Sequence, residues 1–240
     1  MYKFLWLPVL AALAFSLPAQ AADPLQVDGV TEPYRDVTLG LADPGIISHQ
    51  FFAEGDVAKA DDVIMELDTR LEELEVSRRK AVMEQDKVVM DSTRQLFAST
   101  HSVSKQDLTK AEAEYDVASA DYAIAVQQLA NRRLKAPFPG AITEILLHPG
   151  AACAPYQPLV RLVDTSRCYF EGHIDGVAAA RPRLEEPVTV TLADGQSVTA
   201  KICYISPVVD EASGLARIKA VFDNPDGKIR PGMAAKMILP

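Results

Sequence analysis

Between residues 37 and 68, short apolar runs alternate with turn signals. Pro44-Gly45 and Glu54-Gly55-Asp56 each separate runs that are rich in β-branched or aromatic residues. Such runs, interrupted every few residues by Gly or Pro, are typical of short β-strands. We therefore predict several short strands between Val37 and Leu67.

The period of the pattern changes after Leu67. No Gly or Pro occurs from Thr69 to Ala98 or from Lys105 to Lys135, and both stretches are rich in Ala, Glu, Lys, Gln, Arg and Leu. These residues favour helix, so two long helices are expected. At 1.5 Å per residue, a helix of about 30 residues is about 45 Å long.

Apolar and small residues recur in both helical stretches at alternating spacings of three and four, as in the seam of a coiled coil. In the second stretch they are Leu108, Ala111, Tyr115, Ala118, Tyr122, Ala125 and Leu129. The first stretch begins with Leu67, Leu71 and Leu74 and then mixes Ala81 and Val88 with the polar residues Arg78, Gln85 and Ser92. We predict an antiparallel hairpin with a weak first seam. An intramolecular hairpin with no other role is the alternative.

A polar segment, residues 99–104, separates the two helices and is predicted to form the tip of the hairpin. Ser104 is placed to cap the second helix, because a Ser oxygen accepts hydrogen bonds from the first free backbone N–H groups of a helix.

From about Cys168 onward the pattern again predicts β-structure. Val188–Leu192 alternates, Asp194-Gly195 is a hairpin turn signal, and Val198–Ile205 continues as the return strand. Residues 218–222 and 234–239 follow, and residues 178–184 suit one helical turn. Five or six short strands with one small helix predict a compact barrel of about 70 residues.

A short sequence occurs twice, on either side of the predicted hairpin. Pro44-Gly45-Ile46-Ile47 recurs as Pro139-Gly140-Ala141-Ile142, and Gly55 recurs as Gly150 in the same register. A duplicated strand pattern predicts two halves of one β-sandwich, neither of which can bury its apolar face alone. The glycines expected at structural turns are Gly45, Gly55, Gly140, Gly150 and Gly232.

Residues 1–21 have the pattern of a secretory signal peptide: Lys3, an apolar run from Phe4 to Leu17, and an ending Ala19-Gln20-Ala21. An uncleaved anchor is the alternative, although the run is shorter than the roughly 20 residues of a bilayer span. Its removal takes away one Lys and changes the net charge from −9 to −10. That charge argues against nucleic acid as a partner.

The sequence offers little catalytic or metal-binding chemistry. The four histidines have no short repeated spacing, so no metal site is expected. Glycine-rich phosphate loops and the Gly-x-Ser-x-Gly elbow are absent, so no enzyme activity is predicted. No lysine lies where a carrier domain would hold a prosthetic group, and no cofactor is expected. Cys153, Cys168 and Cys203 are too few for a disulfide framework.

Several segments together resemble the periplasmic adaptor subunits, or membrane fusion proteins, of Gram-negative efflux and secretion systems (the HlyD-like family). They are Pro44-Gly45-Ile46, Glu54-Gly55-Asp56-Val57, Val103-Ser104-Lys105-Gln106, Leu134-Lys135-Ala136-Pro137-Phe138-Pro139-Gly140, Val209-Asp210-Glu211-Ala212-Ser213-Gly214, Asn224-Pro225-Asp226-Gly227 and Arg230-Pro231-Gly232-Met233. The resemblance implies a mainly β fold: a split lipoyl-like sandwich interrupted by a long coiled-coil hairpin, then a small β-barrel.

The resemblance also implies a function and partners. The chain would bridge an inner-membrane pump, of RND type by preference or of ABC type, to an outer-membrane TolC-like channel. It would do so in the periplasm, as a homo-oligomer, and in a shortened form without the membrane-proximal domain. The residues expected to dock the channel are Arg94, Phe97, Ser104 and Lys105. The alternative is a regulatory or substrate-capturing periplasmic protein with the same architecture.

The predicted organisation divides the chain into six parts. They are the signal peptide (1–21), an N-terminal lead (22–36), the first lipoyl-like half (37–68), the hairpin (69–133), the second lipoyl-like half (134–166) and the barrel (167–240).

Overall fold

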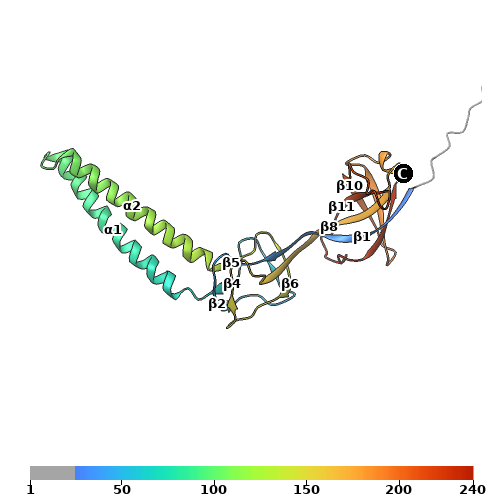
Figure 1. Ribbon diagram of the computed structural model, residues 1–240, viewed down its shortest axis with the longest axis horizontal. Helices are drawn as coiled ribbons and strands as arrows, with labels where there is room; N and C mark the ends of the chain where they lie inside the picture. The colour runs from blue at the N-terminus through green and yellow to red at the C-terminus, as the bar shows by residue number, and fades with distance from the viewer. Residues whose placement is uncertain (1–24, 240) are drawn as a thin grey trace, which may run out of the picture.

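The computed structural model describes residues 25–239, and the predicted signal peptide lies outside that range. The described chain is elongated, with a helical hairpin at one end, a small β domain in the middle and a β-barrel at the other end (Figure 1). The predicted fold class, mainly β with a long helical hairpin and a small barrel, is confirmed.

The barrel is a closed sheet of six antiparallel strands in the order β1-β12-β9-β10-β11-β8, and a pairing of β1 with β8 closes it. Its elements are β1 (Leu25–Leu39), β8 (Val160–Asp175), the short 3-10 helix η1 (Ala178–Ala180), β9 (Pro187–Leu192), β10 (Ser197–Ile205), β11 (Leu215–Asp223) and β12 (Ala234–Leu239).

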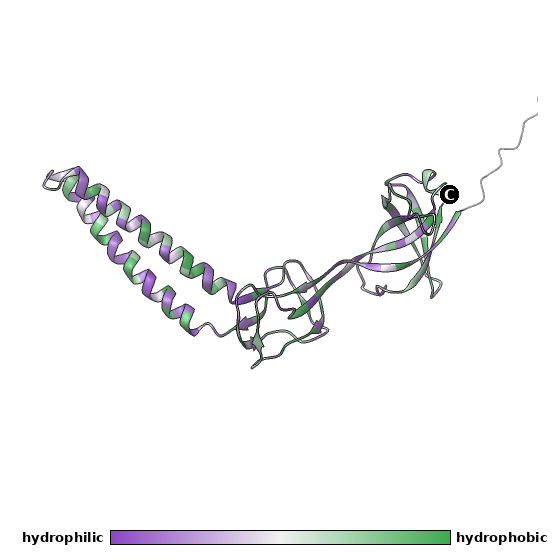
Figure 2. Ribbon diagram, in the orientation of Figure 1, coloured by the Kyte–Doolittle hydropathy of each residue, from purple (hydrophilic) through white to green (hydrophobic). Residues whose placement is uncertain are grey.

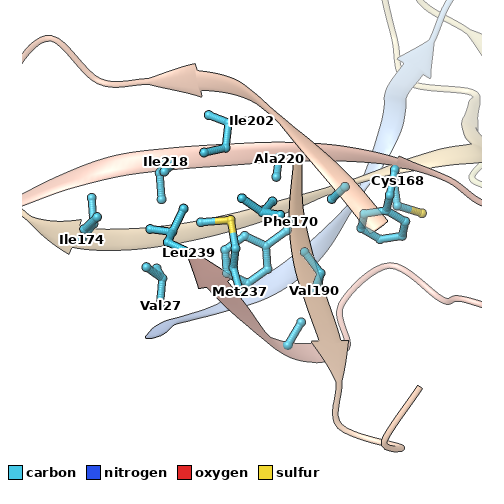
Figure 3. Close-up of a cluster of buried hydrophobic side chains, with 14 of the residues drawn as sticks. Val27, Cys168, Phe170, Ile174, Val190, Ile202, Ile218, Ala220, Met237 and Leu239 are labelled. Atoms are coloured by element: carbon cyan, nitrogen blue, oxygen red, sulfur yellow. The ribbon is translucent and has the colours of Figure 1, made fainter. Parts of the chain in front are cut away.

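Alternating apolar residues fill the barrel, with Phe170 at the centre of the buried cluster (Figure 3). Its ring fits because Gly172 lies beside it on β8. A Cβ atom on Gly172 would lie 2.8 Å from both the Phe170 ring and Val27 Cγ1, closer than packed carbons approach.

The middle domain is assembled from two pieces of chain on either side of the hairpin. Strands β3, β4 and β2 of the first piece pair with β6, β5 and β7 of the second. One buried core joins them, with Ile47 and Ile64 from the first piece and Ile142 and Leu162 from the second. The strands are β2 (Gly45–Gln50), β3 (Val57–Ala58), β4 (Val63–Leu67), β5 (Arg133–Lys135), β6 (Gly140–Ile145) and β7 (Ala152–Cys153).

The predicted lead and the predicted start of the barrel differ from the observed strands. Leu25–Val30 pairs with β12, and β1 then continues along β8 into the middle domain. Residues 25–36 are therefore a barrel strand and its extension. The boundary at residue 167 likewise lies inside β8, because both long strands belong to the two domains at once.

The five glycines fall into two groups. Gly55, Gly150 and Gly232 have φ angles of 93°, 92° and 93° and lie in turns, a backbone conformation that L side chains adopt only at a cost. Gly45 and Gly140 instead begin strands β2 and β6. At Gly140 a side chain is excluded by close approach, because its Cβ would lie 2.7 Å from the Val163 carbonyl oxygen.

The hairpin consists of α1 (Arg70–Ser99) and α2 (Lys105–Asn131). In α2 the predicted seam is confirmed, because Ala111, Ala118 and Ala125 are buried. In α1 the predicted seam is wrong: Leu71, Leu74 and Val88 are 78%, 67% and 66% exposed. The residues that face α2 are instead Glu72, Val76, Arg79, Met83, Asp86, Met90, Thr93 and Phe97, of which Met90 is buried and the others are half-buried.

Charged residues of the α1 seam form ion pairs that could not be predicted from the sequence pattern. The Arg79 guanidinium bonds to Asp121 of α2, and Glu72 bonds to Arg132 just after α2. Arg132 also donates to the Pro44 carbonyl, 2.7 Å away. The Arg79–Asp121 pair therefore joins the two helices, and Arg132 ties the root of the hairpin to the middle domain.

Candidate functional site at the hairpin tip

The turn between the helices is closed by a capping box. The Asp107 N–H donates to Ser104 Oγ at 3.1 Å, and the Ser104 N–H donates to Asp107 Oδ2 at 3.1 Å. The Ser104 hydroxyl also donates to Asp107 Oδ2 at 2.7 Å. The hydrogen bond from the Ser104 side chain, supported by that from its backbone, lowers the pKa of Asp107. Ser104 therefore has a structural role at the start of α2, as the sequence predicted.

On the other side of the tip, α1 ends in a tight turn. The Thr100 N–H donates to the Leu96 carbonyl at 3.1 Å, and His101 has a φ of 52°. The rings of Phe97 and His101 lie with centroids 5.8 Å apart. Phe97 thus supports the turn from the inside and remains half-buried.

Arg94 links the two helices below the tip. Its guanidinium donates to Glu112 Oε1 of α2 at 3.0 Å, and the side chain is 53% exposed. Lys105 is exposed at the start of α2. The four predicted tip residues therefore lie at one end of the hairpin: Phe97 and Ser104 stabilise the turn, Arg94 links the two helices below it, and Lys105 is exposed.

One lateral side of the hairpin exposes apolar residues. Val82, Val89 and Leu96 recur every seven residues of α1, so they lie on one side of it, and they are 42%, 47% and 45% exposed. Val82 and Val117 line a shallow groove of about 400 Å³ between the helices. This side was not predicted, although the seven-residue spacing is present in the sequence.

Further exposed apolar residues lie in loops at one end of the barrel, the end at which β8 finishes after leaving the middle domain. They are Val177, Leu184, Val208 and Val209, which are 87%, 62%, 70% and 42% exposed. They lie in two loops. The first connects Asp175 at the end of β8 to Pro187 at the start of β9 and contains η1, and the second connects Ile205 at the end of β10 to Leu215 at the start of β11. Leu25 pairs with Leu239 at the same end. We call this surface the barrel pole.

Residues 25–239 contain no cluster of three or more His, Cys, Asp or Glu side chains that could hold a metal ion. Burial raises the pKa of the thiols of Cys153, Cys168 and Cys203, which keeps them protonated. Within the described part of the chain, no helix is both long enough and apolar enough to cross a bilayer.

Comparison with known proteins relates the barrel to a sequence family and the chain to several solved structures. Residues 176–240 match the family described as the CusB-like β-barrel domain. A search of curated proteins found no match.

Three solved structures have a similar fold. A MacA-MexA chimeric protein that contains the α-hairpin domain of Pseudomonas aeruginosa MexA is 19% identical, with a TM-score of 0.79 over 90% of this chain and 80% of that one. A putative efflux transporter from Bacteroides eggerthii is 19% identical, with a TM-score of 0.72 over 94% and 73%. The membrane fusion protein Spr0693 from Streptococcus pneumoniae is 16% identical, with a TM-score of 0.70 over 89% and 97%.

At these identities the likeness shows the fold, and the family match rests on the barrel. Both agree with the resemblance that the motifs predicted. Residues 176–240 thus match the CusB-like β-barrel domain family, and the described chain shares the fold of these three solved structures.

Proposed function

We propose that this protein is a non-enzymatic periplasmic adaptor that connects an inner-membrane pump to an outer-membrane channel. The observation that carries the proposal is the separation of two candidate docking surfaces. The hairpin tip and the barrel pole lie at opposite ends of an elongated molecule (Figure 1). A protein of that shape suits partners in two different membranes, as in the systems that the adaptor motifs resemble.

The hairpin tip is the proposed surface for the outer-membrane channel, of TolC-like type. The two helices of the hairpin have 30 and 27 residues and are about 45 Å and about 40 Å long. Arg94, Phe97, Ser104 and Lys105 are the residues proposed to form the contact. Because the other three stabilise the turn or link the two helices, Lys105 is the one whose side chain is free to meet a partner.

The barrel pole is the proposed surface for the pump, with an RND pump favoured over an ABC pump. Its loops expose three valines and one leucine at the same end of the barrel, and exposed apolar residues gathered on one surface mark interaction sites more often than scattered ones do. The middle domain, which we interpret as a split lipoyl-like sandwich, connects this barrel to the hairpin.

We further propose that several copies pack side by side through their hairpins. The apolar side that contains Val82, Val89 and Leu96 offers a surface for a neighbour. Within residues 25–239, Asp86 and Lys87 form no ion pair. Asp86 lines the groove beside Val82, and Lys87 is exposed on the next position of α1, so a neighbouring copy that presents its Lys87 to this groove would bring opposite charges together.

Fractionation of crosslinked envelopes tests the bridging function. Glu66 of β4 pairs with Arg133 of β5, so a short turn can replace residues 70–131 without disturbing the middle domain. The intact protein should appear in both membrane fractions, and the protein without the hairpin should remain only with the inner membrane. Recovery of the intact protein in neither membrane fraction would contradict the proposal.

A further inference from the structure

The barrel and the middle domain are joined mainly by a two-stranded ribbon of β1 and β8. The two hydrophobic cores have no residue in common. Figure 2 shows the two strands crossing the gap between the domains with mixed polar and apolar residues. A ribbon of two strands is easily bent unless other contacts support it, so the angle between the domains depends on the side chains around it.

The pairing of the ribbon is interrupted between the two domains. Pro33 pairs with Cys168, but the next pair is Arg35 with Asp164. One residue of β1, Tyr34, therefore lies opposite three residues of β8, which is a β-bulge. Pro33 has no N–H to donate to the ladder, so a bulge next to it costs few hydrogen bonds.

Other groups anchor the bulge firmly to the barrel. The buried Asn224 amide donates to the Thr165 carbonyl at 2.9 Å, and the Asn224 N–H donates to the Ser166 carbonyl at 2.8 Å. Asp164 accepts from the Ser166 N–H at 3.0 Å. The backbone of the bulge is thus fixed on the barrel side, and bending is confined to the residues around Tyr34.

Aromatic and cationic side chains stack across this point. The Arg167 guanidinium lies 3.7 Å from the centre of the Tyr34 ring, which stacks on Tyr169 at 5.5 Å. Arg35 lies between Tyr34 and Phe138 of the middle domain, 5.3 Å and 5.1 Å from their ring centres.

The stack continues into the barrel at Lys219, which lies 5.7 Å from the Tyr169 ring. Lys219 bonds to Glu32 at 2.8 Å and to Glu171. The series from Phe138 to Lys219 therefore includes the middle domain, both strands of the ribbon and the barrel.

We propose that Phe138, Arg35, Tyr34, Arg167 and Tyr169 form a clasp that sets the angle between the barrel and the middle domain, and so the direction in which the hairpin points. Cation–π contacts at exposed sites are individually weak, but here they act together at the one place where the connection can bend. The inference does not depend on which proteins bind either end.

Distances between spin labels in the mature chain test the clasp. Labels at Lys59→Cys in the middle domain and Gln196→Cys on the barrel, both exposed, report the domain angle in a Cys203→Ser background. The parent should give a narrow distance distribution. Tyr34→Ala should broaden it at least twofold, whereas Tyr34→Phe, which keeps the stacked ring, should leave it narrow.

Tyr204→Ala is the matched control, because Tyr204 stacks with Arg217 at 5.4 Å within the barrel. If Tyr34→Ala does not fold, the same distances are measured in Arg167→Gln, which should also broaden the distribution. Arg167 is exposed, so this substitution should leave the fold intact. An unchanged distribution in the folded Tyr34 or Arg167 variant, or equal broadening by Tyr204→Ala, would overturn the proposal.

Discussion

In this molecule, single polar side chains bond to backbone N–H and C=O groups that have no partner within a strand or helix. Asn224, which is 4% exposed, donates to the Thr165 and Ile229 carbonyls at 2.9 Å and accepts from the Ile229 N–H at 3.1 Å. The Asn224-Pro225-Asp226-Gly227 segment is one of those that carry the resemblance to the adaptor family. The long-range bond to Thr165 could not be predicted, because it depends on the position of the β8 bulge.

The variant Asn224→Ala should destabilise the barrel by about 2–3 kcal/mol, because buried backbone groups lose their partners. Hydrogen exchange of barrel peptides measures the local free energy of opening. Asp226→Ala, in the exposed turn two residues away, is the control and should change it by less than about 0.5 kcal/mol. Equal protection of the two variants would show that the Asn224 bonds are dispensable.

The capping box at the tip makes the start of α2 sensitive to acid. The folded state lowers the pKa of Asp107 below its ordinary value of 3.8. The ionised Asp107 side chain therefore stabilises the start of α2 fully above pH 3.8, and this stabilisation is lost as the pH falls through the lowered pKa. Amide exchange or NMR of residues 104–107 should therefore show fraying of α2 below about pH 4. Asp107→Ala should fray at neutral pH and lose this pH dependence.

Among the secondary-structure elements, both helices of the hairpin were predicted, but the buried seam was predicted correctly only in α2. Two ladders with spacings of three and four run along α1, and the more apolar one faces solvent. The ladder that faces α2 contains the charged residues Glu72, Arg79 and Asp86. Charged residues are normally expected on the exposed side of a helix, so the sequence pattern did not identify this ladder as the buried one. The small alanines of α2 leave room for the long side chains of α1, and Asp121 and Arg132 pair with two of its charges.

The correct register of α1 can be tested with a pair of substitutions. Met90 is 6% exposed. The Met90→Ala substitution should lower the free energy of unfolding of the hairpin by about 2 kcal/mol, because it leaves a cavity in the seam. Val88→Ala should be neutral or slightly stabilising, since Ala favours helix more than Val does. Urea unfolding followed by circular dichroism at 222 nm measures both. The opposite order would support the seam predicted from sequence.

At the scale of the whole molecule, the sequence motifs predicted the order of the parts: strands, hairpin, strands and barrel. They did not predict that β1 and β8 pass from one domain into the other. Residues 22–36 were predicted to be a lead, whereas Gly29 lies opposite Gly172 in the barrel, beside the Phe170 ring. The barrel pole was likewise not predicted, because its valines come from separate loops.

Site-specific photocrosslinking in the native host tests most directly whether one molecule contacts both membranes. Photoreactive residues at Lys105 of the tip and Val208 of the barrel pole should trap an outer-membrane protein and an inner-membrane protein, respectively. The same residue at Lys135, exposed near the root of the hairpin, should trap neither. Capture of no outer-membrane protein from Lys105, or of the same soluble protein from both ends, would contradict the bridging account.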